Sequence, residues 1–347
     1  MRYSSRCLLI LLAAILAAGC SSLDYYAQSV RGQFALIMQS RSIESIIDDA
    51  DVDPALKAWL SRVLEIRAFA TEHLALPDNK SYTRYADIGR PYVVWNVFAA
   101  PELSLEPRQW CFPIAGCVVY RGYFTPEAAQ RFADQLQVQG DDVYVAGISA
   151  YSTLGWFNDP VLSTMLNYED AQLAGLIFHE LAHQVLYIKD DTVFNESFAT
   201  VVELEGMMRW SKRNGDSVIS YLDTKALEER IVNLVLEYRA RLQAVYAAND
   251  SDVEKRERKR EIFSALRAAY QRLPERFAHA GYDDWFAQDL NNAHLVSIGA
   301  YHELVEALQA ELAAVGGDLQ RFYSRVRRIA DLDPVTRRAQ LLLTPAP

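Results

Sequence analysis

The sequence reads Leu176-Ile177-Phe178-His179-Glu180-Leu181-Ala182-His183 near its middle, and this stretch decides both the fold and the chemistry. Side chains four residues apart lie on one face of a helix, one turn from each other, so the imidazoles of His179 and His183 can reach one metal ion. Glu180, beside the first histidine, can then take a proton from a water that the metal activates. The alternative is a helix with two partly buried, hydrogen-bonded histidines and no ion.

A buried helix is expected around this motif. Residues 172–186 contain no proline, and Asn167 or Asp170 can cap the N-terminus. Apolar residues surround most of the helix; they are Leu173, Leu176, Ile177, Leu181 and Val185. Two histidines and a glutamate in such surroundings need polar partners, which a metal ion would supply.

The next helical stretch offers two candidates for a third ligand. Twelve residues separate His183 from Glu196, and nineteen separate it from Glu203. The two glutamates are seven residues apart and therefore share a helix face, so one can bind metal while the other orients a histidine. A solvated surface position is the alternative for each of them. A catalytic zinc keeps three protein ligands and one open position, which two histidines and one glutamate would provide.

The flanking residues favour Glu196. The segment Asn195-Glu196-Ser197-Phe198-Ala199 resembles the NEGFA segment of zinc aminopeptidases of the alanyl aminopeptidase type, and the resemblance implies that Glu196 is the third zinc ligand. The spacing to Glu203 instead resembles thermolysin. Both are gluzincins, which are HExxH zinc metallopeptidases with a glutamate ligand.

Over most of its length the chain resembles a family of putative bacterial aminopeptidases, many of them lipoproteins. Besides HELAHQ and NESFA, the matching segments are 110–113, 120–124 and 151–157. The resemblance implies a zinc peptidase acting on peptides or proteins. Aminopeptidase activity is favoured over endopeptidase activity, although the GxMEN segment that binds a substrate amino terminus in the alanyl aminopeptidase type is absent.

The first residues predict export and a lipid anchor. Two arginines precede an apolar run from Leu8 to Ala18, which is too short to span a bilayer and is typical of a signal peptide. Small residues then lead to Cys20, in a pattern that resembles a bacterial lipobox. The resemblance implies cleavage after residue 19, lipid on Cys20, and sorting to the outer membrane facing the periplasm. An ordinary secretory signal is the alternative.

Charge argues against a nucleic-acid partner. Cleavage after residue 19 would leave 33 basic and 45 acidic residues, and no basic patch with interleaved aromatic residues occurs. Such a chain does not attract nucleic acid or anionic lipid, so contact with the membrane should come from the anchor. In an oxidising compartment, Cys111 and Cys117, which bracket a Pro/Gly turn, are expected to form a disulfide.

The order of elements predicts a mainly helical α+β fold with a thermolysin-like arrangement, a small sheet followed by the active-site helix. We expect a signal peptide at 1–19, a tether at 20–30, a catalytic region at 31–223 with N-terminal helices and sheet, and a helical C-terminal region at 224–347. Within the sheet, residues 146–153 are the candidate edge strand for pairing with extended peptide, with a plain core strand as the alternative.

The working hypothesis is hydrolysis of a peptide bond by Zn²⁺ held on His179, His183 and Glu196, with Glu180 as the base. Tyr301 is the candidate for holding the developing oxyanion, and His294 and His302 are alternatives. A second hypothesis is a lipid-anchored envelope assembly or binding protein with a structural zinc and no catalysis. A metal-free scaffold is a third, whereas a serine hydrolase lacks its GxSxG segment. The sequence leaves the oligomeric state open.

Overall fold

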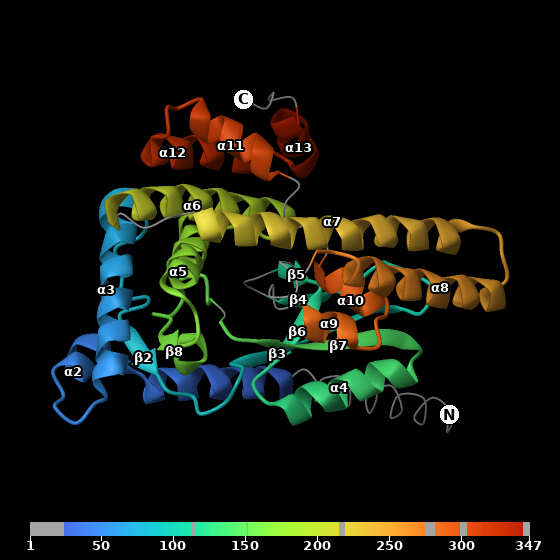
Figure 1. Ribbon diagram of the computed structural model, residues 1–347, viewed down its shortest axis with the longest axis horizontal. Helices are drawn as coiled ribbons and strands as arrows, with labels where there is room; N and C mark the ends of the chain where they lie inside the picture. Colours follow the sequence, from blue (N-terminus) through green and yellow to red (C-terminus); the bar gives the residue numbers. More distant parts are fainter. Residues whose placement is uncertain are drawn as a thin grey trace, which may run out of the picture.

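The structure is a computed structural model that describes residues 24–112, 116–150, 152–214, 219–274, 282–298 and 304–342. Helices predominate and the strands form small sheets, so the prediction of a mainly helical α+β fold is confirmed (Figure 1). The described part of the chain begins with a helix over residues 24–39, followed by β1 (Arg41–Ser42), α2 (Ile43–Ile47), α3 (Pro54–Leu74) and β2 (Arg84–Ala86).

Small sheets precede the motif helix, as expected. Their strands are β3 (Val94–Pro101), β4 (Trp110–Phe112), β5 (Gly116–Val118), β6 (Tyr120–Tyr123), β7 (Asp141–Ile148) and β8 (Val161–Leu162), with α4 (Pro126–Val138) between β6 and β7. The orders are β1-β2-β8, β6-β3-β7 and β4-β5. In the second sheet β7 pairs antiparallel with β3 along its whole length, from Val94 opposite Ile148 to Pro101 opposite Asp141. The strand β7 therefore lies at an edge of its sheet.

The motif helix is α5 (Asp170–Val185), and it packs against α6 (Thr192–Asn214). Its N-cap is Glu169, which forms a capping box with Gln172, so the expectation of Asn167 or Asp170 was wrong. The capping box satisfies two free backbone N–H groups at once, which explains why a glutamate takes this position. The helices come close together at Gly206, where a Cβ atom would lie 2.7 Å from Phe178 and 2.8 Å from Leu74.

The helices after α6 divide between two cores. α7 (Ile219–Ala247) and α8 (Asp252–Gln271) form a hairpin that projects to the right in Figure 1 and shares a core with α9 (Asp283–Ala287) and α10 (Asn292–Ile298). α11 (Val305–Ala313) and α12 (Leu319–Ala330) instead pack in the core that contains α5 and α6, beside α13 (Pro334–Leu342). The region 224–347 is therefore not a single packed unit, and its expected start falls inside α7.

The N-terminal helix begins earlier than the expected tether allowed. Residues 24–30 are helical because their inward side chains have partners on β6: Gln28 contacts the carbonyl of Gly122 and the amide of Phe124, and Tyr25 packs against Tyr123. Residues 1–23, with the signal segment and Cys20, lie outside the described residues. Among the helices that are described, none combines the length and the apolar character needed to cross a bilayer.

The expected disulfide is present. Cys111 and Cys117 are joined across the β4–β5 hairpin. The hairpin contacts the turn between α5 and α6, since the amide of Cys117 donates to the Asp190 carboxylate at 2.6 Å. The disulfide thus closes a small hairpin that lies against the segment joining the two site helices.

Candidate metal centre

Three side chains from α5 and α6 converge on one point. Each of His179, His183 and Glu196 offers a ligand atom, and these atoms lie within 4.8 Å of one another. Nε2 of His179 is 3.2 Å from Nε2 of His183 and 3.2 Å from Oε2 of Glu196, while Nε2 of His183 is 3.7 Å from Oε1 of Glu196. The three residues form a possible metal site.

The donor set fits a tetrahedral zinc ion. Ligand atoms about 2.0–2.1 Å from a tetrahedral centre are about 3.3 Å from each other. The two separations of 3.2 Å lie close to this value, and the 3.7 Å separation involves the other carboxylate oxygen of Glu196. The polarity of the atoms also fits. Nδ1 of His179 faces the Glu203 carboxylate at 2.9 Å, and a carboxylate only accepts, so Nδ1 carries the proton. Burial lowers the pKa of the His179 imidazole, but the hydrogen bonds with Glu196 and Glu203 outweigh this and raise the pKa to about 10. Nε2 therefore carries a second proton until a metal ion displaces it.

Glu203 occupies a different place from Glu196. Its Oε2 accepts from His179 on the side of the ring away from the cluster, and its Oε1 lies 2.8 Å from Nζ of Lys225 and accepts from the Tyr221 hydroxyl. Burial alone would raise the pKa of Glu203, but the hydrogen bond with His179 and the charge of Lys225 outweigh it and lower this pKa to about 2. The carboxylate stays ionised and fixes the orientation of His179.

Tyr221 and Lys225 were not anticipated from the sequence. Both lie on α7, and residues 215–218, which join α7 to α6, lie outside the described ranges. Gly175 of α5 makes room for Tyr221, because a Cβ there would lie 2.3 Å from the tyrosine hydroxyl oxygen. A small residue one helical turn before His179 is the only sequence signal of this approach.

The residue before Glu196, Asn195, helps to position that glutamate through its side-chain hydrogen bonds. Its side-chain amide donates to the carbonyl of Ile188 and its side-chain oxygen accepts from the amide of Ile188, both at 2.7 Å. The residue is 1% exposed. This pair of bonds fixes the turn after α5 to the first part of α6, and so sets the position of Glu196 relative to the histidines.

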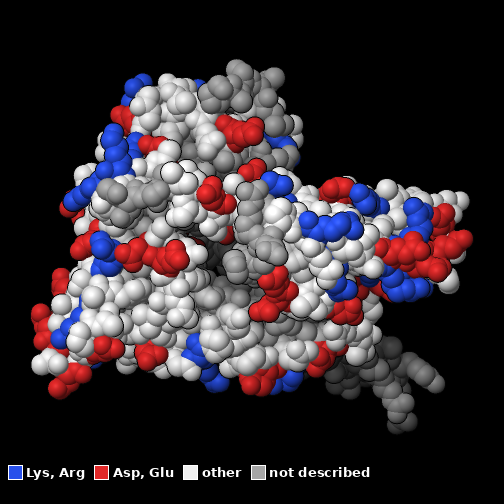
Figure 2. Space-filling model, viewed as in Figure 1, with Lys and Arg blue, Asp and Glu red and all other residues white. Residues whose placement is uncertain are grey.

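Glu180 lies on α5 between the two histidines and is partly exposed. Burial raises its pKa to about 7, the charge of His179 opposes the rise, and the carboxylate of Glu196 adds to it. The face of the molecule in Figure 2 is hollowed near the position that α5 occupies in Figure 1, with acidic side chains beside the hollow.

Of the three candidates for an oxyanion donor, the structure describes only His294. Tyr301 and His302 lie outside the described residues. His294 is buried in the core of α7–α10, where its ring stacks on Tyr144 at 4.1 Å and Nδ1 contacts Asn291. His294 is therefore a packing residue. Among the described tyrosines, Tyr187 has its ring 6.2 Å from that of His183.

The expected peptide-binding strand is present only in part. β7 is an edge strand, but it ends at Ile148, and residues 149, 150, 152 and 153 are not part of a strand. The following loop is built around the buried Asp159, whose carboxylate accepts from the amide and the hydroxyl of Thr153. Two aromatic side chains of this loop, Trp156 and Phe157, are 66% and 49% exposed.

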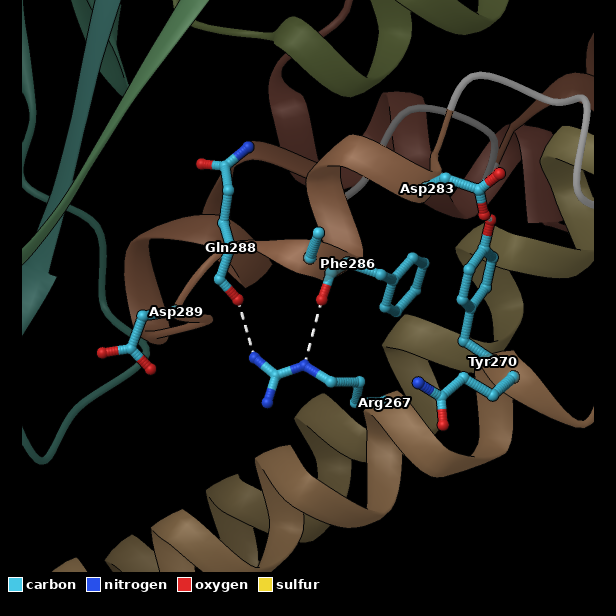
Figure 3. Close-up of a pocket in the computed structure, with 8 residues that line it drawn as sticks. Arg267, Tyr270, Asp283, Phe286, Gln288 and Asp289 are labelled. Carbon is cyan, nitrogen blue, oxygen red and sulfur yellow. Dashed lines mark hydrogen bonds between the residues drawn. The ribbon is translucent and has the colours of Figure 1, made fainter.

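A hollow of about 520 Å³ between α8 and α9 is not a second candidate. Three of its polar side chains are already paired within the protein: Arg267 donates to the carbonyls of Phe286 and Gln288, and Tyr270 donates to Asp283 (Figure 3). Among the residues drawn in Figure 3, the carboxylates of Asp283 and Asp289 lie apart and do not face a common point.

Comparison with known proteins identifies a family for the chain. A family model described as "Putative aminopeptidase" matches residues 24–341, which include α5, α6 and all the described ligands. No curated protein and no solved structure matches the chain. The family description indicates a peptidase, and the possible metal site lies inside the matched region. Because the match extends over nearly the whole chain, this protein belongs to the putative aminopeptidase family.

Proposed function

We propose that this protein is a zinc-dependent peptidase of the gluzincin type, with aminopeptidase activity favoured. The observation that carries the proposal is the convergence of three ligand atoms, from His179, His183 and Glu196, close to the spacing of zinc ligands. Two neutral imidazoles and a carboxylate leave a fourth position open for a reactant, which favours catalysis over a structural site.

His179, His183 and Glu196 would hold the ion. When bound, zinc supplies Lewis acidity, which polarises the peptide carbonyl and makes water easier to deprotonate. Glu180 accepts the proton of the attacking water on a carboxylate oxygen as the new C–O bond forms. It then delivers this proton to the amine nitrogen as the C–N bond breaks. A carboxyl group with a pKa near 7 can perform both transfers near neutral pH.

We propose that a hydrogen-bond donor assists at the carbonyl oxygen, and Tyr301 remains the candidate. Removing such a donor lowers kcat about 10²–10³-fold. Tyr301→Phe is expected to lower kcat by this order with little change in KM, whereas Tyr187→Phe, which alters the tyrosine beside His183, serves as the comparison. A Tyr301→Phe enzyme with the parent kcat would remove this residue from the mechanism.

The proposed location is the outer membrane facing the periplasm, through lipid on Cys20. The disulfide between Cys111 and Cys117 is compatible with an oxidising compartment. Fatty-acid labelling of the parent chain and of Cys20→Ser tests the anchor directly. Label in the parent and none in the variant is expected; an unlabelled parent would point to an ordinary secretory signal.

The experiment for the function is peptide hydrolysis by Glu180→Gln. This variant should keep its zinc and lose turnover, because the substitution removes the base and no ligand. Glu205→Gln is the matched control, since Glu205 lies on α6 and pairs with Arg209. If Glu180→Gln cleaves peptides as fast as the parent, the catalytic proposal fails and the structural-zinc alternative takes its place.

A further inference from the structure

The helix over residues 24–39 has an apolar side that no part of the described chain covers. Tyr26, Val30, Phe34 and Met38 follow one another at intervals of four residues and are 43%, 67%, 61% and 69% exposed. Side chains at this spacing form one line along a helix, about 18 Å long over twelve residues. From residue 25 to residue 39 the helix carries one charged side chain, Arg31.

The opposite side of this helix is fixed to the protein, so the exposed line cannot turn inward. Leu36 is 3% exposed in the main core, and Tyr25 packs against Phe112 with ring centroids 5.5 Å apart. The helix comes so close to the end of β6 that a Cβ at Gly32 would lie 2.1 Å from the ring of Phe124. The four outward side chains are therefore held at the surface by the packing behind them.

The chain that precedes the helix indicates what covers this surface. Three residues separate Cys20 from residue 24, so even a fully extended link places the start of the helix within about 14 Å of the lipidated cysteine. An uncharged line of apolar and aromatic side chains so close to an acyl anchor suits the boundary between headgroups and acyl chains.

We propose that the line of Tyr26, Val30, Phe34 and Met38 lies in the surface of the lipid bilayer. This inference rests on the proposed anchor at Cys20. The helix lies parallel to the membrane and adds a second contact to the lipid. It thereby fixes the orientation of the whole protein, because its inner side is packed on β6 and the main core. In Figure 1 the helix runs along the lower edge and α6 lies towards the opposite side.

Thiol accessibility in the intact chain tests this placement. Met38→Cys and Met208→Cys are a matched pair, since both methionines are exposed and Met208 lies on α6 at 48% exposure. With Cys111 and Cys117 joined and Cys20 acylated, the introduced thiol is the only free one in the mature chain. The protein is reconstituted in phosphatidylethanolamine–phosphatidylglycerol vesicles and treated with a membrane-impermeant maleimide.

In vesicles the cysteine at position 38 should react about tenfold or more slowly than the cysteine at 208, because a thiol in the bilayer surface forms little of the reactive thiolate. In the mature chain with Cys20→Ser, free in dilute solution, both should react alike. Equal rates in vesicles would overturn the proposal. Protection at 38 that appears in solution and increases with protein concentration would also overturn it, in favour of a second copy of the chain.

The anchor and the helix surface can fail separately. Partition of the parent into a detergent phase reports the lipid, whereas the position-38 thiol reports the helix. If the parent carries no lipid, the anchor proposal fails, and the same labelling is done after mixing the chain with preformed vesicles. Protection at 38 would then still support the helix contact, and its absence would refute it.

Discussion

Oε2 of Glu203 lies 2.9 Å from Nδ1 of His179, on the side of the ring that faces away from the candidate metal centre. The same carboxylate is held from α7 by Tyr221 and Lys225, and it is 5% exposed as a residue. The orientation of His179, a candidate metal ligand, is thus determined in part by a third helix. A charged, buried acceptor of this kind strengthens the ligand and fixes its tautomer.

Removing this acceptor should weaken metal binding without removing a ligand. Glu203→Gln is expected to lower zinc affinity about 10–100-fold, measured by competition with a chromophoric chelator. Lys225→Met should lower it less, because the Glu203–His179 bond remains. Glu205→Gln on the same helix should bind zinc like the parent. Unchanged affinity in Glu203→Gln would mean that the 2.9 Å contact has no part in holding the metal.

Close packing of α5 on α6 should be sensitive to one methyl group. Gly206→Ala would place a Cβ within 2.8 Å of Phe178 and Leu74, and overpacking of this kind costs about 1–3 kcal/mol, more than the ~1 kcal/mol gained in helix propensity. The free energy of unfolding, measured in urea, should fall accordingly. Met208→Ala, on the exposed side of α6, is the control and should stay within ~0.5 kcal/mol of the parent. If Gly206→Ala were as stable as this control, α5 and α6 would be able to move apart without loss of stability.

The hairpin disulfide should contribute modestly to stability. Cys111 and Cys117 are six residues apart, and closing so short a loop stabilises the native state by about 2 kcal/mol in the chain-entropy description. In the double Cys→Ser variant, the free energy of unfolding measured in urea should fall by this amount. The variant should keep its zinc, because the proposed ligands lie on α5 and α6. A loss of zinc together with stability would contradict the separation of hairpin and metal centre.

Acid should destabilise the core of α7–α10 through His294. Burial lowers the pKa of His294 to about 4, whereas an unfolded histidine has a pKa of about 6.5. Above pH ~6.5 the imidazole is neutral in both states. As the pH falls towards 4, the unfolded chain binds a proton at His294 and the folded chain does not. This difference lowers the free energy of unfolding by up to ~3 kcal/mol.

The measurement is the free energy of unfolding between pH 7 and pH ~4.5, within the range set by these two pKa values. His294→Phe keeps the ring contact with Tyr144 and cannot titrate, so its stability should decrease less steeply than that of the parent. Identical slopes for the parent and His294→Phe would contradict the account.

Much of the centre could be predicted because its ligands follow helical periodicity. His179 and His183 are one turn apart, and the NESFA segment singled out Glu196, which the structure places beside them. The contacts of Glu203 with Tyr221 and Lys225 could not be predicted, because they depend on how α7 crosses α5 and α6. The packing of Tyr25 and Gln28 on β6, which makes residues 24–30 helical, is a tertiary contact of the same kind.

The helix cap and the edge strand show the limits of local sequence patterns. Glu169 caps α5 through a reciprocal pair of bonds with Gln172, whereas the single-residue preference for Asn or Asp pointed elsewhere. The predicted strand at 146–153 is present only as far as Ile148, where β7 ends opposite Val94, the first residue of its partner strand β3. Strand ends are determined by the partner, which the local sequence does not contain.

The central claim is that His179, His183 and Glu196 hold one zinc ion, and the metal content of the purified chain tests it most directly. The parent and Glu180→Gln, dialysed against zinc and then against metal-free buffer, should each retain one equivalent. His183→Ala should retain none, because two of the three ligands cannot hold the ion. A parent chain that retains no zinc, or a His183→Ala chain that retains as much as the parent, would contradict the account.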